Sequence, residues 1–194
     1  MRKKKLSEEP IELELLEKEL KREKHKHRYA LVIKSTVYTL ITVAAVAVLI
    51  ATLWLPVLQI YGSSMTPHLA DGDIVVSTTS RQFESGDIIA FYYNNKVLVK
   101  RVIAKSGDWV NITETGDVFV NDVLLDEPYV SEKTMGDCDL EMPYQVPEGK
   151  WFVLGDHRSV SVDSRNTAVG CVGSEQVVGK IMFRVWPLKY IGPL

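Results

Sequence analysis

The sequence predicts a mainly β protein, in which an antiparallel β-sheet domain is preceded by a single N-terminal transmembrane helix. Two observations carry this prediction. The 24 residues from 35 to 58 contain no charged side chain. The residues that follow contain short runs of Val, Ile and aromatic residues, separated by turn-forming residues. We therefore expect a charged tail at 1–33, a membrane anchor at 34–58 and an extracytoplasmic β-rich domain at 59–194.

The net charge of -2 conceals two halves of opposite sign. Residues 1–58 carry 11 Lys and Arg against 7 Glu, and residues 59–194 carry 12 Lys and Arg against 18 Asp and Glu. The second half has no basic groove and no basic-aromatic patch, so we expect no nucleic-acid partner. No His/Cys cluster has metal-ligand spacing, and we expect neither a metal nor a cofactor.

The first 28 residues are dense in charge, and the run from Ser7 to Pro10 is typical of a helix start. Leu13, Leu16 and Leu20 would form a narrow apolar stripe on this helix. The stripe fits either a solvated charged helix or a short coiled coil that binds a partner. The basic residues between 21 and 28 are suited to anionic lipid headgroups.

The apolar run 35–58 would be about 36 Å long as a helix, enough to cross a hydrocarbon layer of ~30 Å. Lys34 precedes it, and Trp54 lies near its far end, where an interfacial aromatic residue is expected. The run ends without the small-x-small exit of a cleaved signal, which indicates an uncleaved anchor. The Lys and Arg excess before it places the N-terminus in the cytoplasm and the following domain outside.

The rest of the chain reads as short strands bounded by turn residues. Hairpin turns are expected at Asn94-Asn95 and Thr115-Gly116-Asp117, and residues 126–150 read as an extended polar loop. The expected strands are Val57–Tyr61, Asp73–Ser77, Asp87–Tyr93, Lys96–Ile103, Trp109–Thr113, Asp117–Leu125, Trp151–Gly155 and Val177–Trp186.

The two cysteines, Cys138 and Cys171, both lie in the β-rich half. If that half is outside the cell, they could form a disulfide. Two separate free thiols remain the alternative, because a sequence does not show how closely the Cα atoms approach.

Ser64 lies on the stretch from Gly62 to Pro67, a few residues beyond the apolar run. A serine on such a turn presents its hydroxyl at the membrane surface. Gly62 permits close backbone approach, and Pro67 fixes the direction in which the chain leaves. The alternative is an ordinary loop serine that caps its own backbone.

Lys100 lies in a predicted strand, where its side chain shares a face with Leu98 and Val102, and Arg101 points to the other face. One of these two cations must therefore lie on the apolar side. Burial disfavours a charged amine and lowers the pKa of a lysine. A neutral lysine amine can take a proton from a serine hydroxyl. The alternative is an edge-strand lysine whose head remains in water.

A dense polar run from Gly155 to Arg165 follows the apolar strand at 151–154. Asp163 and Arg165 can form a charge-assisted pair that makes the loop rigid. Ser161 can exchange a hydrogen bond with the Lys100 amine. A polar loop held by local turns is the alternative. His157 would complete a Ser-His-Asp triad, but we expect a loop histidine to be solvated or capping when Lys100 already supplies a base.

Five segments then follow one another along the chain: Gly62–Pro67, Gly86–Phe91, Lys100–Ile103 with Gly107-Asp108, Gly155–Arg165 and Gly179–Pro187. In this order they resemble the motifs of the type I bacterial signal peptidases, which are membrane-anchored Ser-Lys endopeptidases. The short connections resemble the smaller, Gram-positive-type members. The resemblance covers nearly all of residues 57–187 and implies a signal-peptidase-like antiparallel β-sheet catalytic domain.

The resemblance implies a role for each site residue. Ser64 would be the nucleophile, with its backbone N–H as the oxyanion donor, and Lys100 would be the general base. Ser161 would orient the lysine amine, and Asp163 and Arg165 would hold the site together. Binding of the substrate would involve Met65 and Pro67.

Three positions depart from the family pattern. Some relatives carry a serine two residues before the nucleophile as a second oxyanion donor, and here that residue is Gly62. His68 and His157 stand where Thr and Asn are common.

The implied function is removal of N-terminal signal peptides from exported preproteins after small-x-small sites. Membrane lipid and the secretion translocase are the expected associates. Two alternatives remain at this point: a non-catalytic, membrane-anchored chaperone or pilus-assembly factor on the same fold, and a related Ser-Lys enzyme that cleaves itself.

Overall fold

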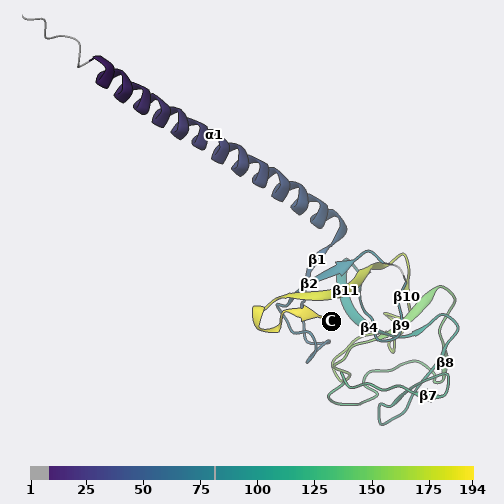
Figure 1. Cartoon of the computed structure of the whole chain (residues 1–194). Helices are drawn as coiled ribbons and strands as arrows, with labels where there is room; N and C mark the ends of the chain where they lie inside the picture. Colours follow the sequence, from purple (N-terminus) through teal and green to yellow (C-terminus); the bar gives the residue numbers. More distant parts are fainter. Residues whose placement is uncertain (1–8, 81) are drawn as a thin grey trace, which may run out of the picture. The chain divides into compact units, whose positions relative to one another are not determined.

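The computed structural model describes residues 9–80 and 82–194. It divides into two compact units, Met1–Ala51 and Thr52–Leu194, which are described separately below. The described part of the first unit is helical, and most regular elements of the second are strands, as Figure 1 shows. The antiparallel β-sheet fold class with one N-terminal apolar helix is therefore confirmed.

Helix α1 runs from Glu9 to Trp54 and joins the charged tail and the apolar run in one element of 46 residues. Among the described residues, one helix is long and apolar enough to cross a membrane, within Leu15–Ile50, with a mean hydropathy of 2.0. The stripe of Leu13, Leu16 and Leu20 is exposed. Residues 7 and 8 of the expected helix start lie outside the described residues, and the side chains of residues 9, 10 and 54 are not described.

Three hydroxyl groups in the apolar half of α1 are satisfied within the helix. Thr36, Thr39 and Thr42 each donate to the backbone carbonyl four residues earlier, at 2.9 Å. A hydroxyl without a partner is costly in hydrocarbon, where no water can replace the missing bond. These threonines are therefore compatible with a membrane-spanning segment.

The helix ends four residues before the anchor boundary expected at residue 58. Pro56 lacks an N–H and disfavours the helical conformation in the preceding residue, so the helix stops at Trp54. Residues 57 and 58, which the sequence assigned to the anchor, belong to the first strand instead.

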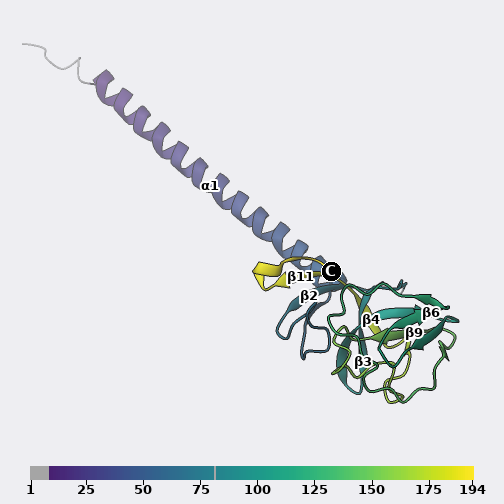
Figure 2. The same ribbon diagram turned by 90° about the horizontal axis from the view of Figure 1, so that it is seen from below.

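The larger sheet has eight strands, all paired in antiparallel fashion. Strand β12 (Gly192–Pro193) pairs with β11 outside the main path. The others follow in the spatial order β1 (Val57–Gln59), β2 (Ile74–Thr78), β11 (Val177–Trp186), β3 (Ile88–Tyr93), β4 (Lys96–Lys105), β9 (Lys150–Leu154) and β10 (Val172–Gly173). Figure 2 shows β3, β4 and β9 from a second direction.

The smaller sheet has the order β7 (Val123–Leu124), β6 (Val118–Val120), β5 (Trp109–Ile112) and β8 (Tyr144–Gln145). The single strand expected at Asp117–Leu125 is wrong, because a hairpin turn divides it. Asn121 and Asp122 adopt φ values of 51° and 65°, which suit a two-residue hairpin turn. Of the two expected turns, Asn94 and Asn95 form one with φ values of 44° and 62°, and Thr115-Gly116-Asp117 lies in the other, between β5 and β6.

The other seven expected strands are confirmed to within two residues at each end. The sequence missed β8, β10 and β12, each only two residues long. It also missed the 3-10 helix η1 (Leu188–Tyr190). Elements this short contain no measurable periodicity. Cys138 and Cys171 are free thiols, so the disulfide alternative is not realised.

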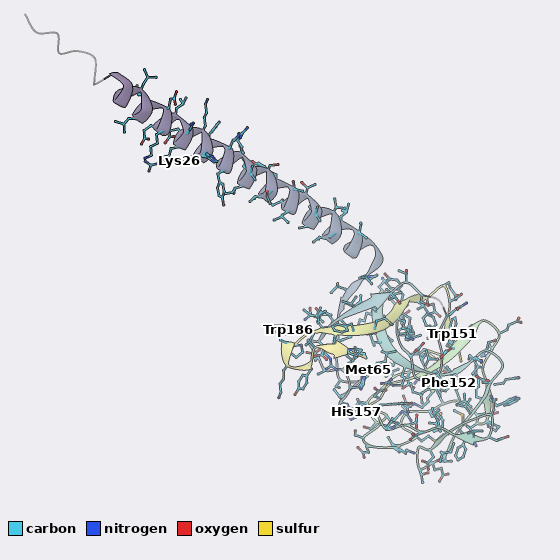
Figure 3. The ribbon with its side chains drawn as sticks, viewed as in Figure 1. Lys26, Met65, Trp151, Phe152, His157 and Trp186 are labelled. Carbon is cyan, nitrogen blue, oxygen red and sulfur yellow. The ribbon has the colours of Figure 1, made fainter. Side chains whose placement is uncertain are left out.

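Buried apolar side chains attach the Ser64 turn to the larger sheet. Met65 and Leu69, from the chain after Ser64, form one core cluster with Ile88 and Ala90 of β3. Two further clusters fill the space around β4 and β9, and Figure 3 shows Trp151 and Phe152 of β9 among them. The turn that carries Ser64 therefore rests on the sheet core.

Substitution of Gly179 tests how tightly β11 packs on β2. An added Cβ at Gly179 would lie 2.0 Å from the backbone oxygen of Thr78. We expect Gly179→Ala to reduce the free energy of unfolding by about 1–3 kcal/mol, because a backbone atom cannot move aside cheaply. Denaturant unfolding measures the change. Gly192→Ala is the matched control, since its Cβ would meet no atom within 4 Å, and equal losses in both variants would contradict the packing.

Candidate active site

The turn that carries Ser64 connects β1 to β2 and is held by short hydrogen bonds. The Thr66 N–H donates to the Ser63 carbonyl at 3.1 Å, and the Leu69 N–H donates to the Met65 carbonyl at 2.8 Å. Gly62 enters the turn with φ +88°, a value that L side chains rarely adopt. The Ser64 side chain is half-buried at the surface of this turn.

Lys100 meets Ser64 directly. Its amine Nζ donates to Ser64 Oγ at 2.6 Å, although 36 residues separate the two in the chain. Lys100 lies opposite Ile89 in the β3–β4 register and is only 2% exposed. Burial lowers the pKa of Lys100 to about 8; Asp163 opposes the shift and Arg165 adds to it. With this pKa, roughly a tenth of the amines are neutral at pH 7 and half at about pH 8.

Arg101, the next residue on β4, is buried as well, at 7% exposed. The sequence required one of the two cations on the apolar side, and the structure buries both. Arg101 donates to Asp156 through Nε at 2.9 Å and Nη2 at 2.7 Å, and its guanidinium lies 4.0 Å from the Tyr129 ring centroid. The Arg101 charge thus has a carboxylate partner, whereas the Lys100 amine has a hydroxyl.

The pair expected between Asp163 and Arg165 is present and fully buried. Arg165 donates to Asp163 through Nε at 2.8 Å and Nη2 at 2.9 Å. Asp163 also accepts the Gly155 N–H at 3.0 Å, and Arg165 donates to the carbonyls of Arg158 and Met135. These bonds fix the loop from 155 to 165.

Ser161 lies at the site, but its hydroxyl makes no hydrogen bond to Lys100 among the described contacts. Its Oγ is buried and makes no hydrogen bond within the residues that the structure describes. A Cβ built on Gly155 would lie 2.2 Å from Ser161 Oγ and 2.6 Å from the Ser64 carbonyl oxygen. The hydroxyl therefore sits beside Gly155, next to the Ser64 turn, because the missing side chain leaves room there.

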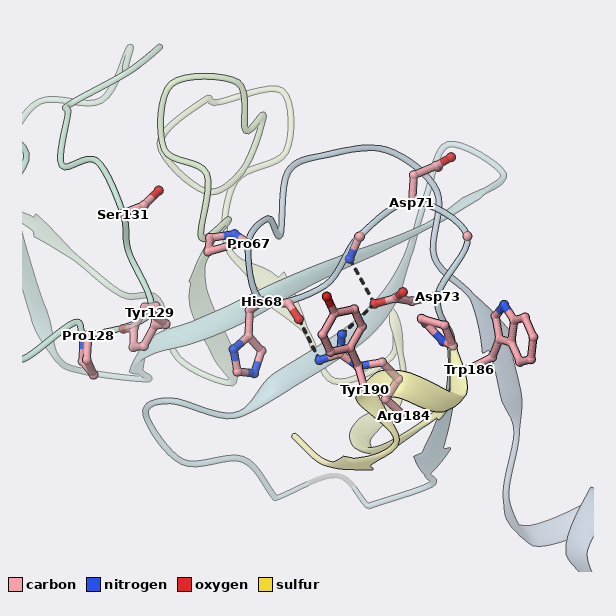
Figure 4. Close-up of a pocket in the computed structure, with 13 residues that line it drawn as sticks. Pro67, His68, Asp71, Asp73, Pro128, Tyr129, Ser131, Arg184, Trp186 and Tyr190 are labelled. Carbon is pink, nitrogen blue, oxygen red and sulfur yellow. Dashed lines mark hydrogen bonds and ion pairs between the residues drawn. The ribbon is translucent and has the colours of Figure 1, made fainter.

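The two residues expected to bind substrate line different cavities. Met65 joins Ser64 in a small cavity of about 60 Å³, between residues 58–62 and residues 97–99 of β4. Pro67 instead lines a cavity of about 810 Å³, together with His68, Tyr129 and Arg184. Figure 4 shows this larger cavity, in which Arg184 donates to Asp73 and to the His68 carbonyl. Burial lowers the pKa of His68.

The sequence did not reveal two buried carboxylates near the site. Asp156 binds Arg101, and Glu127 binds both terminal nitrogens of Arg158. Glu127 belongs to the stretch 126–150, whose composition indicated only a polar loop. No local spacing relates Glu127 to an arginine 31 residues away.

His157 approaches the Ser64 turn from the 155–165 loop. Its N–H donates to the Ser64 carbonyl at 3.0 Å, and its ring Nδ1 lies 2.9 Å from Thr66 Oγ1. Figure 3 labels Met65 and His157 in this domain.

Across residues 9–80 and 82–194, no group of three or more His, Cys, Asp or Glu could hold a metal ion.

The described geometry contains the parts of a nucleophile and base pair. A serine hydroxyl within hydrogen-bond reach of an amine with a lowered pKa can transfer its proton and become a nucleophile. The Ser64 N–H donates to no group in the described part of the chain and so remains free for an oxyanion.

Comparison with known proteins identifies relatives. A family model described as "Signal peptidase, peptidase S26" matches residues 33–186. Thylakoidal processing peptidase 1 of Arabidopsis thaliana is 38% identical over 146 residues, which cover 66% of this chain and 41% of the plant protein. Signal peptidase IB of Staphylococcus aureus (strain COL) is 37% identical over 151 residues, which cover 67% of this chain and 77% of that protein.

The crystal structure of a signal peptidase I from Enterococcus faecalis V583 is 30% identical in sequence and superposes with a TM-score of 0.42. The match covers 51% of this chain and 96% of that one. The family assignment depends on the two sequence comparisons. Because the family model spans most of the chain and the staphylococcal relative aligns over 77% of its own length, this chain belongs to the signal peptidase family, peptidase S26.

Proposed function

We propose that this protein is a membrane-bound serine endopeptidase that removes N-terminal signal peptides from exported preproteins, with Ser64 and Lys100 as its catalytic dyad. The observation that carries the proposal is the 2.6 Å hydrogen bond from a buried lysine amine to a serine hydroxyl. Family membership supports the reaction class. The alternative of a non-catalytic chaperone or pilus-assembly factor gains no support from the relatives.

The proposed reaction is acyl transfer. Neutral Lys100 accepts the Ser64 proton as Oγ attacks the carbonyl carbon of the scissile bond. The Ser64 N–H stabilises the oxyanion, and one such donor is worth roughly 3–4 kcal/mol in known serine enzymes. The protonated Lys100 then gives its proton to the leaving amine. Lys100 next takes a proton from a water that attacks the acyl-enzyme and releases the signal peptide.

Three further residues act through the dyad. Asp163 and Arg165 hold the loop 155–165 in place, since their mutual hydrogen bonds are all buried. Ser161 has a buried hydroxyl without a partner among the described residues, and its proposed role is to orient the Lys100 amine. Catalytic hydrogen bonds are often long in the free enzyme and shorten when substrate binds.

The substrate is proposed to bind as an added strand. β9 pairs with β4 only from Arg101 to Lys105, and β1 pairs with β2 on one side, so residues 97–99 and 58–62 present edges to the cavity that contains Ser64. An extended peptide can use such edges for main-chain hydrogen bonds. A cavity of about 60 Å³ admits only a small side chain next to the scissile bond.

The helix α1 is proposed as the anchor that holds this site at the outer surface of the membrane. The excess of Lys and Arg before the apolar run places the N-terminus in the cytoplasm and the strands outside. Anchoring brings enzyme and signal peptide into one layer and so raises their effective concentration. Contact with membrane lipid and with the secretion translocase is part of the same proposal.

Substitution of either dyad residue tests the proposal. We expect Ser64→Ala and Lys100→Met each to abolish cleavage of a preprotein in a gel assay, because each removes one partner of the proton transfer. The thermal midpoint of Lys100→Met should be kept or raised, since methionine needs no desolvation of a charge. Full cleavage by either folded variant would contradict the dyad. Self-cleavage without turnover of added preprotein would select the self-processing alternative.

The pH dependence tests the state of the amine. The base must be neutral, so kcat/KM should rise with pH and reach half its maximum near the Lys100 pKa of about 8. Initial rates on a peptide between pH 5 and 10 measure this limb. A limb near pH 6.5 that disappears in His157→Ala would instead point to a histidine base.

Peptide substrates test the small cavity. We expect a peptide with Ala before the scissile bond to be cleaved, and one with Phe there to lose at least about 100-fold in kcat/KM, because the cavity of about 60 Å³ excludes an aromatic ring. A matched peptide with Phe two residues after the scissile bond controls for solubility. Equal cleavage of the Ala and Phe peptides would contradict a size-limited site.

A further inference from the structure

His157 connects three parts of the proposed site. Its N–H donates to the Ser64 carbonyl at 3.0 Å, and its ring Nδ1 lies 2.9 Å from Thr66 Oγ1. Its own carbonyl accepts the Ser161 N–H at 3.1 Å. One residue therefore contacts the turn that carries the nucleophile at two points and also holds the turn that carries Ser161.

The proton positions in this contact follow from the chemistry of the partners. Thr66 Oγ1 lies 2.8 Å from the Ser63 carbonyl oxygen, which can only accept a hydrogen bond. The Thr66 hydroxyl donates its one proton to this oxygen. The Thr66 oxygen then accepts from Nδ1–H in the His157 tautomer that is protonated at Nδ1. In that tautomer Nδ1 cannot accept a proton from Ser64.

His157 is held firmly on both sides. Asp156 and Arg158, its neighbours in sequence, are each 1% exposed. Asp156 is bound twice by Arg101 of β4, and Arg158 is bound to Glu127. Such buried pairs leave the backbone on both sides of His157 little freedom, so the loop holds in place the residue that contacts Thr66.

We propose that His157 is a positioning residue, which through Thr66 holds the Ser63–Thr66 turn so that the Ser64 hydroxyl stays at the Lys100 amine. This inference rests on the proposed function of the dyad. His157 touches neither Ser64 Oγ nor Lys100 Nζ in the described contacts and acts only through the turn.

The expected kinetic signature is a loss in kcat with little change in KM. A displacement of about 1 Å between nucleophile and base costs up to roughly 100-fold in rate. The cavity that holds the substrate side chain is lined by Met65 and by strand residues, not by His157. Substrate binding should therefore survive the loss of the imidazole.

The experiment is a double-mutant cycle on the full-length protein in detergent micelles. His157→Leu and Thr66→Val should each lower kcat roughly 10- to 100-fold on a small-x-small peptide. The double variant should be no slower than the slower single variant, because both remove the same bond. His157→Asn should recover most of the lost kcat, since its amide nitrogen is attached to Cγ as Nδ1 is. Ser159→Ala, on an exposed residue of the same loop, is the control.

Assays run below the lowest thermal midpoint of the set, so that unfolding does not enter the rates. Three results would each overturn the positioning role. The first is a loss of kcat in the double variant equal to the product of the two single losses. The others are a rise in KM at constant kcat and a failure of His157→Asn to recover kcat. In those cases an active wild type and an inactive Ser64→Ala leave the dyad intact. A wild type that cleaves no peptide would overturn the proposed function, and this inference with it.

Discussion

The site depends on a lysine amine that is buried without a carboxylate partner. Among the described residues, all four buried carboxylates, Asp73, Glu127, Asp156 and Asp163, form ion pairs with arginines. The Lys100 amine, only 2% exposed, bonds to the Ser64 hydroxyl instead. A carboxylate next to this amine would hold its proton and raise its pKa. Pairing each acid with an arginine, which stays charged, leaves Lys100 as the cation that burial can neutralise.

The same ion pairs also build the domain around the site. Arg101 joins β4 to the loop at Asp156, Arg158 joins that loop to the stretch at Glu127, and Arg165 closes the loop on Asp163. Loss of one partner from a buried pair costs several kcal/mol, because the other charge remains uncompensated. The same arginine–carboxylate pairs therefore have two effects. They make the loop 155–165 rigid, and they leave Lys100 without a carboxylate partner.

The sequence predicted the elements whose signals are local. The alternation of apolar residues predicted a strand at Lys100. The short spacing of Asp163 and Arg165 predicted their ion pair, and the order of the five segments indicated the family. The split at Asn121-Asp122 was missed because both flanking runs are apolar, and β8, β10 and β12 are too short for any pattern. Glu127 lies 31 residues from Arg158 in the chain, and Asp156 lies 55 residues from Arg101. Local sequence spacing cannot predict contacts between residues this far apart.

Direct titration of the Lys100 amine by NMR tests the central claim. The Nζ and Cε shifts of a selectively labelled protein, assigned with Lys100→Met, report the protonation state of this one group. The account predicts a midpoint near the pKa of about 8, well below the 10.5 of an unperturbed lysine. A midpoint at the value of an exposed lysine, ~10.4, would show that the ammonium persists, and would contradict a dyad based on a neutral amine.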